Sequence, residues 1–97
     1  MSVHKLKLDA CFYSDSKMGI KTFEIRKDDR EFHVGDILEL REWVYSNLEK
    51  KGTYTGDVHW KIITYILDDA EYLRNGYVCL GVSPIAEPEE RQAKADV

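Results

Sequence analysis

The sequence predicts an α+β domain in which five to six mostly antiparallel strands pack with one principal helix that follows the first strand. Short stretches of alternating or β-branched apolar residues recur along the chain, and residues typical of turns separate them. A single stretch, which ends at about Met18, carries helix signals at both of its ends. The 97 residues are enough for one hydrophobic core but not for two.

The first strand is predicted at residues 3–8, where apolar and polar side chains alternate. Asp9 can then cap a helix, and Gly19 can end that helix in the left-handed conformation. Residues 14–16 are indifferent helix formers, so we expect packing on the sheet to stabilise this helix. The side chains expected to provide that packing are Ala10, Tyr13 and Met18.

A second strand is predicted from Thr22 to Arg26, where polar and apolar residues again alternate. The alternation predicts that Phe23 and Ile25 are buried together on one face. Thr22, Glu24 and Arg26 are then expected on the other face.

Three more strands are predicted at residues 37–44, 53–67 and 77–82. The stretch 53–67 is apolar on both faces, which indicates a strand that lies centrally in the sheet or closes a barrel. In the stretch 37–44, the alternation places Leu38, Leu40 and Val44 on one face and Glu39, Arg41 and Trp43 on the other. Core packing is the simpler interpretation of Trp43, and the alternative is a surface on which a base stacks, with Tyr45 beside it.

The end of the chain has a different composition. From Glu87 onward it carries four acidic and two basic residues and almost no large apolar side chains, so half of the formal net charge of −4 belongs here. We therefore expect residues 1–84 to form the domain and residues 85–97 to be a disordered acidic tail.

Several function classes are disfavoured. Cys11 and Cys79 are far apart in sequence, and the three histidines show no ligand spacing with them, so we expect no metal site and no cofactor. No apolar run approaches the ~20 residues of a membrane span, and the N-terminal residues lack the apolar region of a signal peptide. These observations predict a cytoplasmic protein without a membrane partner.

Positive charge gathers in the acidic chain between residues 17 and 30. Five basic and three acidic residues lie here, which gives a local charge of +2. Such a pattern often marks a solvated strand with surface ion pairs, each worth only about 0.2–1 kcal/mol. The alternative interpretation is a site for an anionic ligand.

The string from Gly19 to Leu38 favours that alternative, because it resembles the signature of a small ASCH-type, PUA-like family found in bacteria and phages. The resemblance continues in Tyr54-Thr55-Gly56, Tyr65-Ile66-Leu67 and Gly76-Tyr77-Val78, and it covers about residues 4–83. It implies an open β-barrel of the PUA-like type. In this superfamily the pattern Gly-x-Lys-x-x-x-x-Arg, often with an acidic residue inside it, lines a cleft. The pattern corresponds here to Gly19, Lys21, Glu24 and Arg26.

The superfamily is generally proposed to bind RNA, and a few of its members are hydrolases. We therefore predict a module that binds RNA or a nucleotide-like anionic ligand. Mild overall acidity favours a pocket for one nucleotide over a groove for a long strand. The expected ligand-binding residues are Gly19, Lys21, Thr22, Glu24, Arg26, Lys27, Arg30 and Tyr45.

Two other functions compete with this prediction. In a nucleoside amidohydrolase or ribonuclease, the catalytic candidates would be Lys21, Thr22 and Glu24. Small ASCH amidohydrolases, however, carry threonine where this chain has Glu24, and the candidates for their distal acid are Asp68, Asp69 and Glu71. A phage-encoded inhibitor or adaptor would instead use the domain as a scaffold and expose contiguous aromatic residues remote from Lys21.

Overall fold

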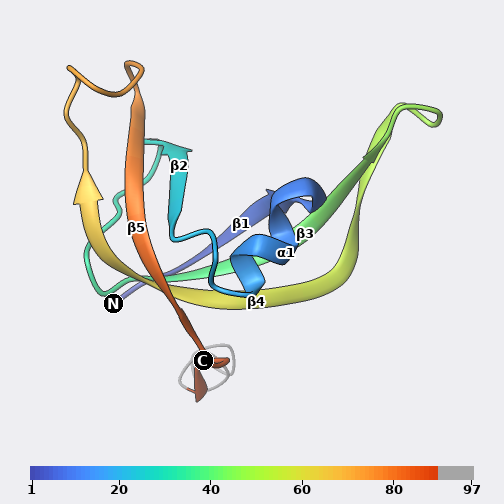
Figure 1. Ribbon diagram of the computed structural model, residues 1–97, viewed down its shortest axis with the longest axis horizontal. Helices are drawn as coiled ribbons and strands as arrows, with labels where there is room; N and C mark the ends of the chain where they lie inside the picture. Colours follow the sequence, from blue (N-terminus) through green and yellow to red (C-terminus); the bar gives the residue numbers. More distant parts are fainter. Residues whose placement is uncertain (90–97) are drawn as a thin grey trace.

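The computed structural model describes residues 1–89 and contains five strands and one short helix (Figure 1). The elements are, in chain order, β1 (Val3–Asp9), α1 (Ala10–Lys17), β2 (Phe23–Lys27), β3 (Ile37–Ser46), β4 (Lys51–Leu67) and β5 (Tyr77–Ile85). The predicted α+β class and the helix after the first strand are confirmed. The disordered tail predicted for residues 85–97 falls mostly on residues 90–97, which lie outside the described residues.

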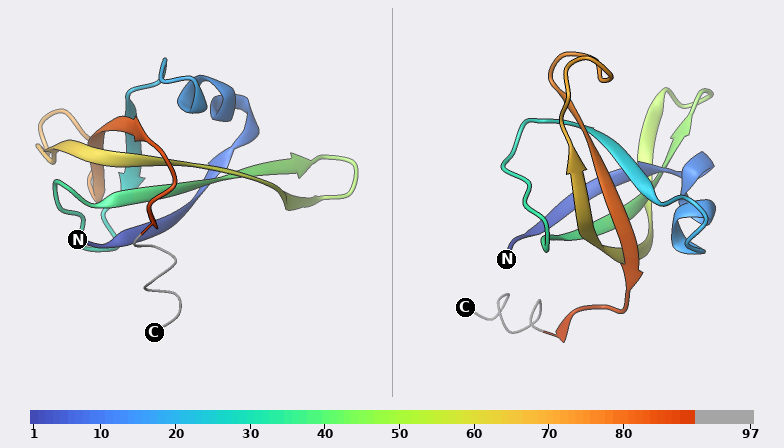
Figure 2. Two further views of the ribbon diagram at one scale, coloured as in Figure 1. Left: turned by 90° about the horizontal axis from the view of Figure 1, so that it is seen from below. Right: turned by 60° about the vertical axis from the view of Figure 1, so that its left-hand side comes forward.

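All five strands belong to one curved sheet with the order β1-β3-β4-β5-β2. The β1–β3 pairing is parallel and the other three pairings are antiparallel. The sheet is therefore mostly antiparallel, as predicted. The sheet is not closed into a barrel, because β1 and β2 are its two edges and are not paired with each other. β3 and β4 continue together as a long hairpin that leaves the body of the domain (Figure 2).

The hydrophobic core lies on the concave side of this sheet (Figure 1). β4 is the central strand of the sheet, which is one of the two positions predicted for it. Each fully buried aliphatic side chain stabilises the fold by roughly 1.5–3 kcal/mol. The buried apolar residues come from α1 and from every strand except β2, and they are Leu6, Leu8, Tyr13, Leu38, Leu40, Ile63, Val78, Leu80 and Val82.

Local signals set both ends of α1. The Asp9 carboxylate accepts a hydrogen bond from the Cys11 amide at 2.9 Å, and Gly19 has a φ of +83°. The prediction that Met18 packs on the sheet is wrong, because its side chain is 69% exposed. Met18 follows Tyr13 by five positions, which places it roughly 140° away around a helix from the buried side chain.

A polar contact also holds α1 against β4. Ser16 is fully buried, and its Oγ lies 2.8 Å from His59 Nε2. The Tyr13 ring meets the His59 ring edge-on at 4.7 Å. Burial, to which the charge of Lys61 adds, lowers the pKa of His59 from 6.5 to about 4, so this histidine is neutral in the folded protein at pH 7.

The alternation predicted for residues 37–44 holds only for the first part of β3. Leu38 and Leu40 are buried, but Val44 is 42% exposed. The register with β4 shifts between Arg41 and Trp43, and such a bulge reverses the faces of the residues that follow it.

The His59 contact predicts a specific loss of stability in mild acid. The unfolded chain takes up a proton at His59 near pH 6.5, whereas the folded protein does so only at about 4. The free energy of unfolding should therefore fall as the pH decreases from 6.5 towards 4, by on the order of 1–3 kcal/mol from this group. His59→Gln should flatten the pH dependence in this window, as measured by urea unfolding at several pH values. Parallel profiles for the two proteins would contradict the assignment.

Candidate functional site

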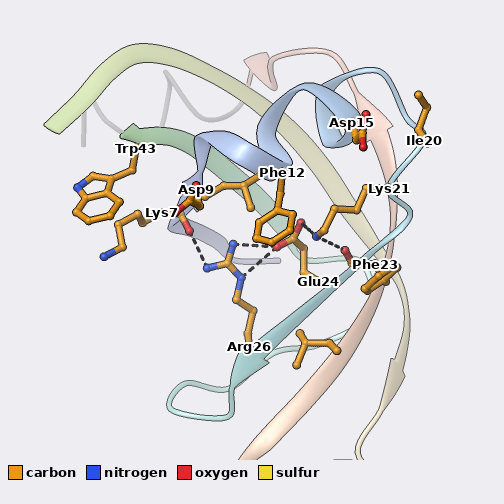
Figure 3. A pocket seen from close by; sticks show the side chains of 12 residues that line it. Lys7, Asp9, Phe12, Asp15, Ile20, Lys21, Phe23, Glu24, Arg26 and Trp43 are labelled. Atoms are coloured by element: carbon orange, nitrogen blue, oxygen red, sulfur yellow. Dashed lines mark hydrogen bonds and ion pairs between the residues drawn. The ribbon is translucent and has the colours of Figure 1, made fainter. Parts of the chain in front are cut away.

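A cleft of about 700 Å³ lies where the open edges of the sheet approach each other beneath α1 (Figure 3). Residues of β1, α1, the connection that follows it, β2 and β3 line the cleft. Charged side chains form its centre, and aromatic and aliphatic side chains form its walls.

The carboxylate of Glu24 is the central group of the cleft, and only 2% of this residue is exposed. Lys21 Nζ donates to Glu24 Oε2 at 2.6 Å, and Arg26 donates to Oε1 from Nη2 at 2.9 Å and from Nε at 3.2 Å. Lys21 Nζ also donates to the Phe23 carbonyl, and Arg26 Nη1 donates to the Lys7 carbonyl on β1 at 2.8 Å. Because these contacts converge from both sides, the carboxylate has a fixed position.

The prediction for the faces of β2 is therefore wrong. Glu24 points inward, whereas Phe23 and Ile25 are 46% and 53% exposed. The inner face of β2 lies over a buried ammonium group from β4, and a buried charge needs a counter-charge. Glu24 supplies that negative charge, which places its apolar neighbours on the outside.

This ammonium belongs to Lys61, which is completely buried and is not among the predicted site residues. Its Nζ donates to the carbonyl oxygen of Lys21 at 2.7 Å. Burial lowers the pKa of Lys61, the charge of Glu24 opposes this shift and the charge of Lys21 adds to it. The available signal was a lysine in the middle of a strand that is apolar on both faces, since such a lysine has no solvated face to occupy.

Residues 3–82 match the family described as Domain of unknown function (DUF3850). The chain belongs to this family. It is also 36% identical over 78 residues to the "Uncharacterized 12.9 kDa protein in GpA 3'region" of Escherichia phage P2. That alignment covers 80% of this chain and 65% of the phage protein, so the chain spans slightly less than two thirds of its relative.

The part of the chain that matches the DUF3850 family contains every residue that lines the cleft. Of the predicted site residues, Lys21, Glu24 and Arg26 lie together here. Gly19 does not line the cleft and lies in the turn after α1. A Cβ atom added to this glycine would lie 3.4 Å from the Pro84 side chain. The Thr22 side chain is exposed outside the cleft, and its carbonyl accepts from the Val82 amide.

The other predicted residues lie beside the cleft. Lys27 and Arg30 line a neighbouring hollow that also includes Arg26. Tyr45 is outside both depressions, with its ring centre 5.9 Å from that of Trp43.

Three aromatic side chains contribute to the cleft walls: Phe12 from α1, Phe23 from β2 and Trp43 from β3. Phe12 and Phe23 are about half exposed. Trp43 packs closely against Gly52, where an added Cβ would come 1.7 Å from an atom of the indole ring. The ammonium of Lys7 lies 4.1 Å from the centre of the Trp43 ring, in a cation–π contact.

Within residues 1–89, no group of three or more His, Cys, Asp and Glu side chains is arranged to hold a metal ion. A helix with the length and apolar character needed to cross a membrane is also absent from this part of the chain.

Neutralising Glu24 should destabilise the domain strongly. Glu24→Gln would leave Lys21, Arg26 and the buried Lys61 close together without their shared carboxylate. We expect the free energy of unfolding to fall by about 3–5 kcal/mol, measured by urea unfolding at neutral pH. Glu71→Gln, at an exposed position, is the matched control and should change it by less than about 0.5 kcal/mol. Equal effects of the two changes would show that the cluster does not stabilise the fold.

Proposed function

We propose that this domain binds RNA by accepting one unpaired nucleotide in the cleft. The observation that carries the proposal is the buried carboxylate of Glu24, held in a fixed orientation at the centre of a cavity of about 700 Å³ with exposed aromatic walls. Binding pockets of this size class commonly combine apolar walls with a few oriented polar groups. Unstacked RNA bases are recognised in this way, by stacking on aromatic rings and by hydrogen bonds to their edges.

The centre of the cleft offers both acceptors and donors. Each oxygen of Glu24 has two lone pairs. Oε1 accepts twice from Arg26 and Oε2 accepts once from Lys21, which leaves one acceptor position, on Oε2, for a base N–H or a ribose hydroxyl. Lys21 uses two of its three donors and Arg26 three of its five. The remaining donors suit a base carbonyl, so the site matches an edge that carries both donors and acceptors.

We further assign the domain to the ASCH and PUA-like superfamily and its location to the cytoplasm. The assignment is supported by the pattern Gly19-x-Lys21-x-x-x-x-Arg26, whose two basic residues line the cleft. A curved five-stranded sheet with a helix after β1 is compatible with the open barrel that this superfamily implies.

Binding is favoured over hydrolysis by the position of Thr22. A hydrolase would need its hydroxyl beside Lys21 and Glu24, but Thr22 is absent from the cleft lining. A role as a protein adaptor is the third candidate, and the exposed rings of Tyr65 and Tyr72 lie outside the cleft. We favour the cleft because Phe12 and Phe23 are exposed around a charged, oriented centre.

The cleft can be tested through its aromatic walls. Phe12→Ala and Phe23→Ala should each weaken binding of a fluorescein-labelled single-stranded RNA octamer of mixed sequence by roughly 5- to 100-fold, since each removes a stacking surface. Both side chains are about half exposed, so we expect folded variants, to be verified by thermal unfolding. Tyr72→Ala removes an aromatic ring that is 74% exposed and outside the cleft, and it should leave affinity unchanged.

Two results would overturn the proposal. One is the absence of RNA binding by the wild-type protein at protein concentrations up to the millimolar range. The other is turnover of RNA or of an acylated nucleoside that is lost in Lys21→Ala, which would make the cleft an active site.

A further inference from the structure

A second hollow, of about 360 Å³, adjoins the cleft and shares Lys7 and Arg26 with it. It lies where β1 and β2 face each other across the open seam and extends to the loop after β2. Its lining contains five basic side chains, namely Lys5, Lys7, Arg26, Lys27 and Arg30. Asp29 is the single acidic residue of that lining, which leaves a local charge of +4 in a chain of formal net charge −4.

The basic side chains of the cleft are paired with a carboxylate, whereas some of those in the hollow are not. In the cleft, Lys21 and Arg26 are both paired with Glu24. In the hollow, Lys5 and Lys27 are exposed, and neither forms an ion pair with a carboxylate of residues 1–89. A bound phosphate is attracted most strongly by cations that are accessible and are not already paired with a carboxylate.

Two other cations of the hollow, Lys7 and Arg30, are only partly engaged by other groups. Lys7 makes a cation–π contact with Trp43, and Arg30 pairs with Asp29 at 3.5 Å, with both side chains well exposed. Figure 3 shows Lys7 and Trp43 at the end of the cleft opposite Ile20. The hollow therefore continues the cleft at this end.

We infer that the hollow, which we call the phosphate hollow, binds the phosphodiester next to the nucleotide in the cleft. The inference rests on the proposed function and specifies its ligand as a single-stranded polynucleotide rather than a free nucleoside. The neutralised cluster around Glu24 reads the base or ribose, and the unpaired lysines of the two edge strands provide the attraction for the backbone. Lys7 and Arg26 lie where the two parts of the ligand join.

The test is the salt dependence of binding in a variant that changes only the hollow. Lys5→Gln combined with Lys27→Gln should weaken binding of the labelled RNA octamer by roughly 5- to 50-fold at about 0.1 M NaCl. The logarithm of the association constant for the RNA should fall less steeply with log[NaCl]. The slope should become shallower by about 0.7–1.4, as expected for one or two lost phosphate contacts on a single strand.

A variant of equal net charge provides the control. Lys50→Asn combined with Lys51→Gln removes two exposed lysines at the β3–β4 turn, outside both depressions. Asparagine is chosen because residue 50 has a φ of 59°, a conformation that asparagine tolerates. We expect this control to retain the wild-type slope.

The outcomes separate this inference from the proposed function. An unchanged slope in the Lys5 and Lys27 variant, or an equal change in the control, overturns the inference that the phosphate hollow binds the backbone. The proposed nucleotide cleft still stands in that case if the Phe12 and Phe23 variants lose affinity. Failure of the wild-type protein to bind the octamer overturns the proposed function and this inference with it.

Discussion

The cluster of charges around Glu24 is the interaction on which the arrangement of this domain depends. Lys21 and Arg26 are both paired with the Glu24 carboxylate, and the fully buried ammonium of Lys61 is stabilised by its charge. Each of these charges alone would be costly to remove from water. The Lys61 contact with the Lys21 carbonyl connects β4 to the segment that leads into β2, although β5 separates the two strands in the sheet. The orientation of β2 follows, and with it the exposure of Phe23 and Ile25 that gives the cleft part of its apolar walls.

The open seam of the sheet provides the space for this site. If β1 and β2 were paired by backbone hydrogen bonds, the sheet would close and the edges would approach to about 4.8 Å. Here the guanidinium of Arg26 crosses the seam instead, with one nitrogen on the Lys7 carbonyl of β1 and two on Glu24 of its own strand. A side-chain bridge holds the edges at a distance and leaves both depressions accessible between them.

The distribution of charge supports the proposal that this acidic chain binds an anionic ligand. Net charge determines long-range attraction, whereas a bound phosphate responds mainly to charges within about a Debye length. The paired cations of the cleft orient hydrogen-bonding groups, and the unpaired lysines of the hollow provide a local positive potential. This division suits selective binding of a short segment, because a broad basic surface would hold any nucleic acid.

The sequence by itself determined the elements whose signals are local. Asp9 and Gly19 set the ends of α1, and the doubly apolar stretch 53–67 became the central strand. The charged motif was also recognisable, since Lys21 and Arg26 lie close enough in the chain to share one neighbour. Only the tertiary structure decided that Glu24 faces inward, that Lys61 is buried beneath it and that the sheet stays open. Alternation fixes the period of a strand but not which of its faces is buried. That choice came here from the buried charge of Lys61 on another strand, for which Glu24 is the counter-charge.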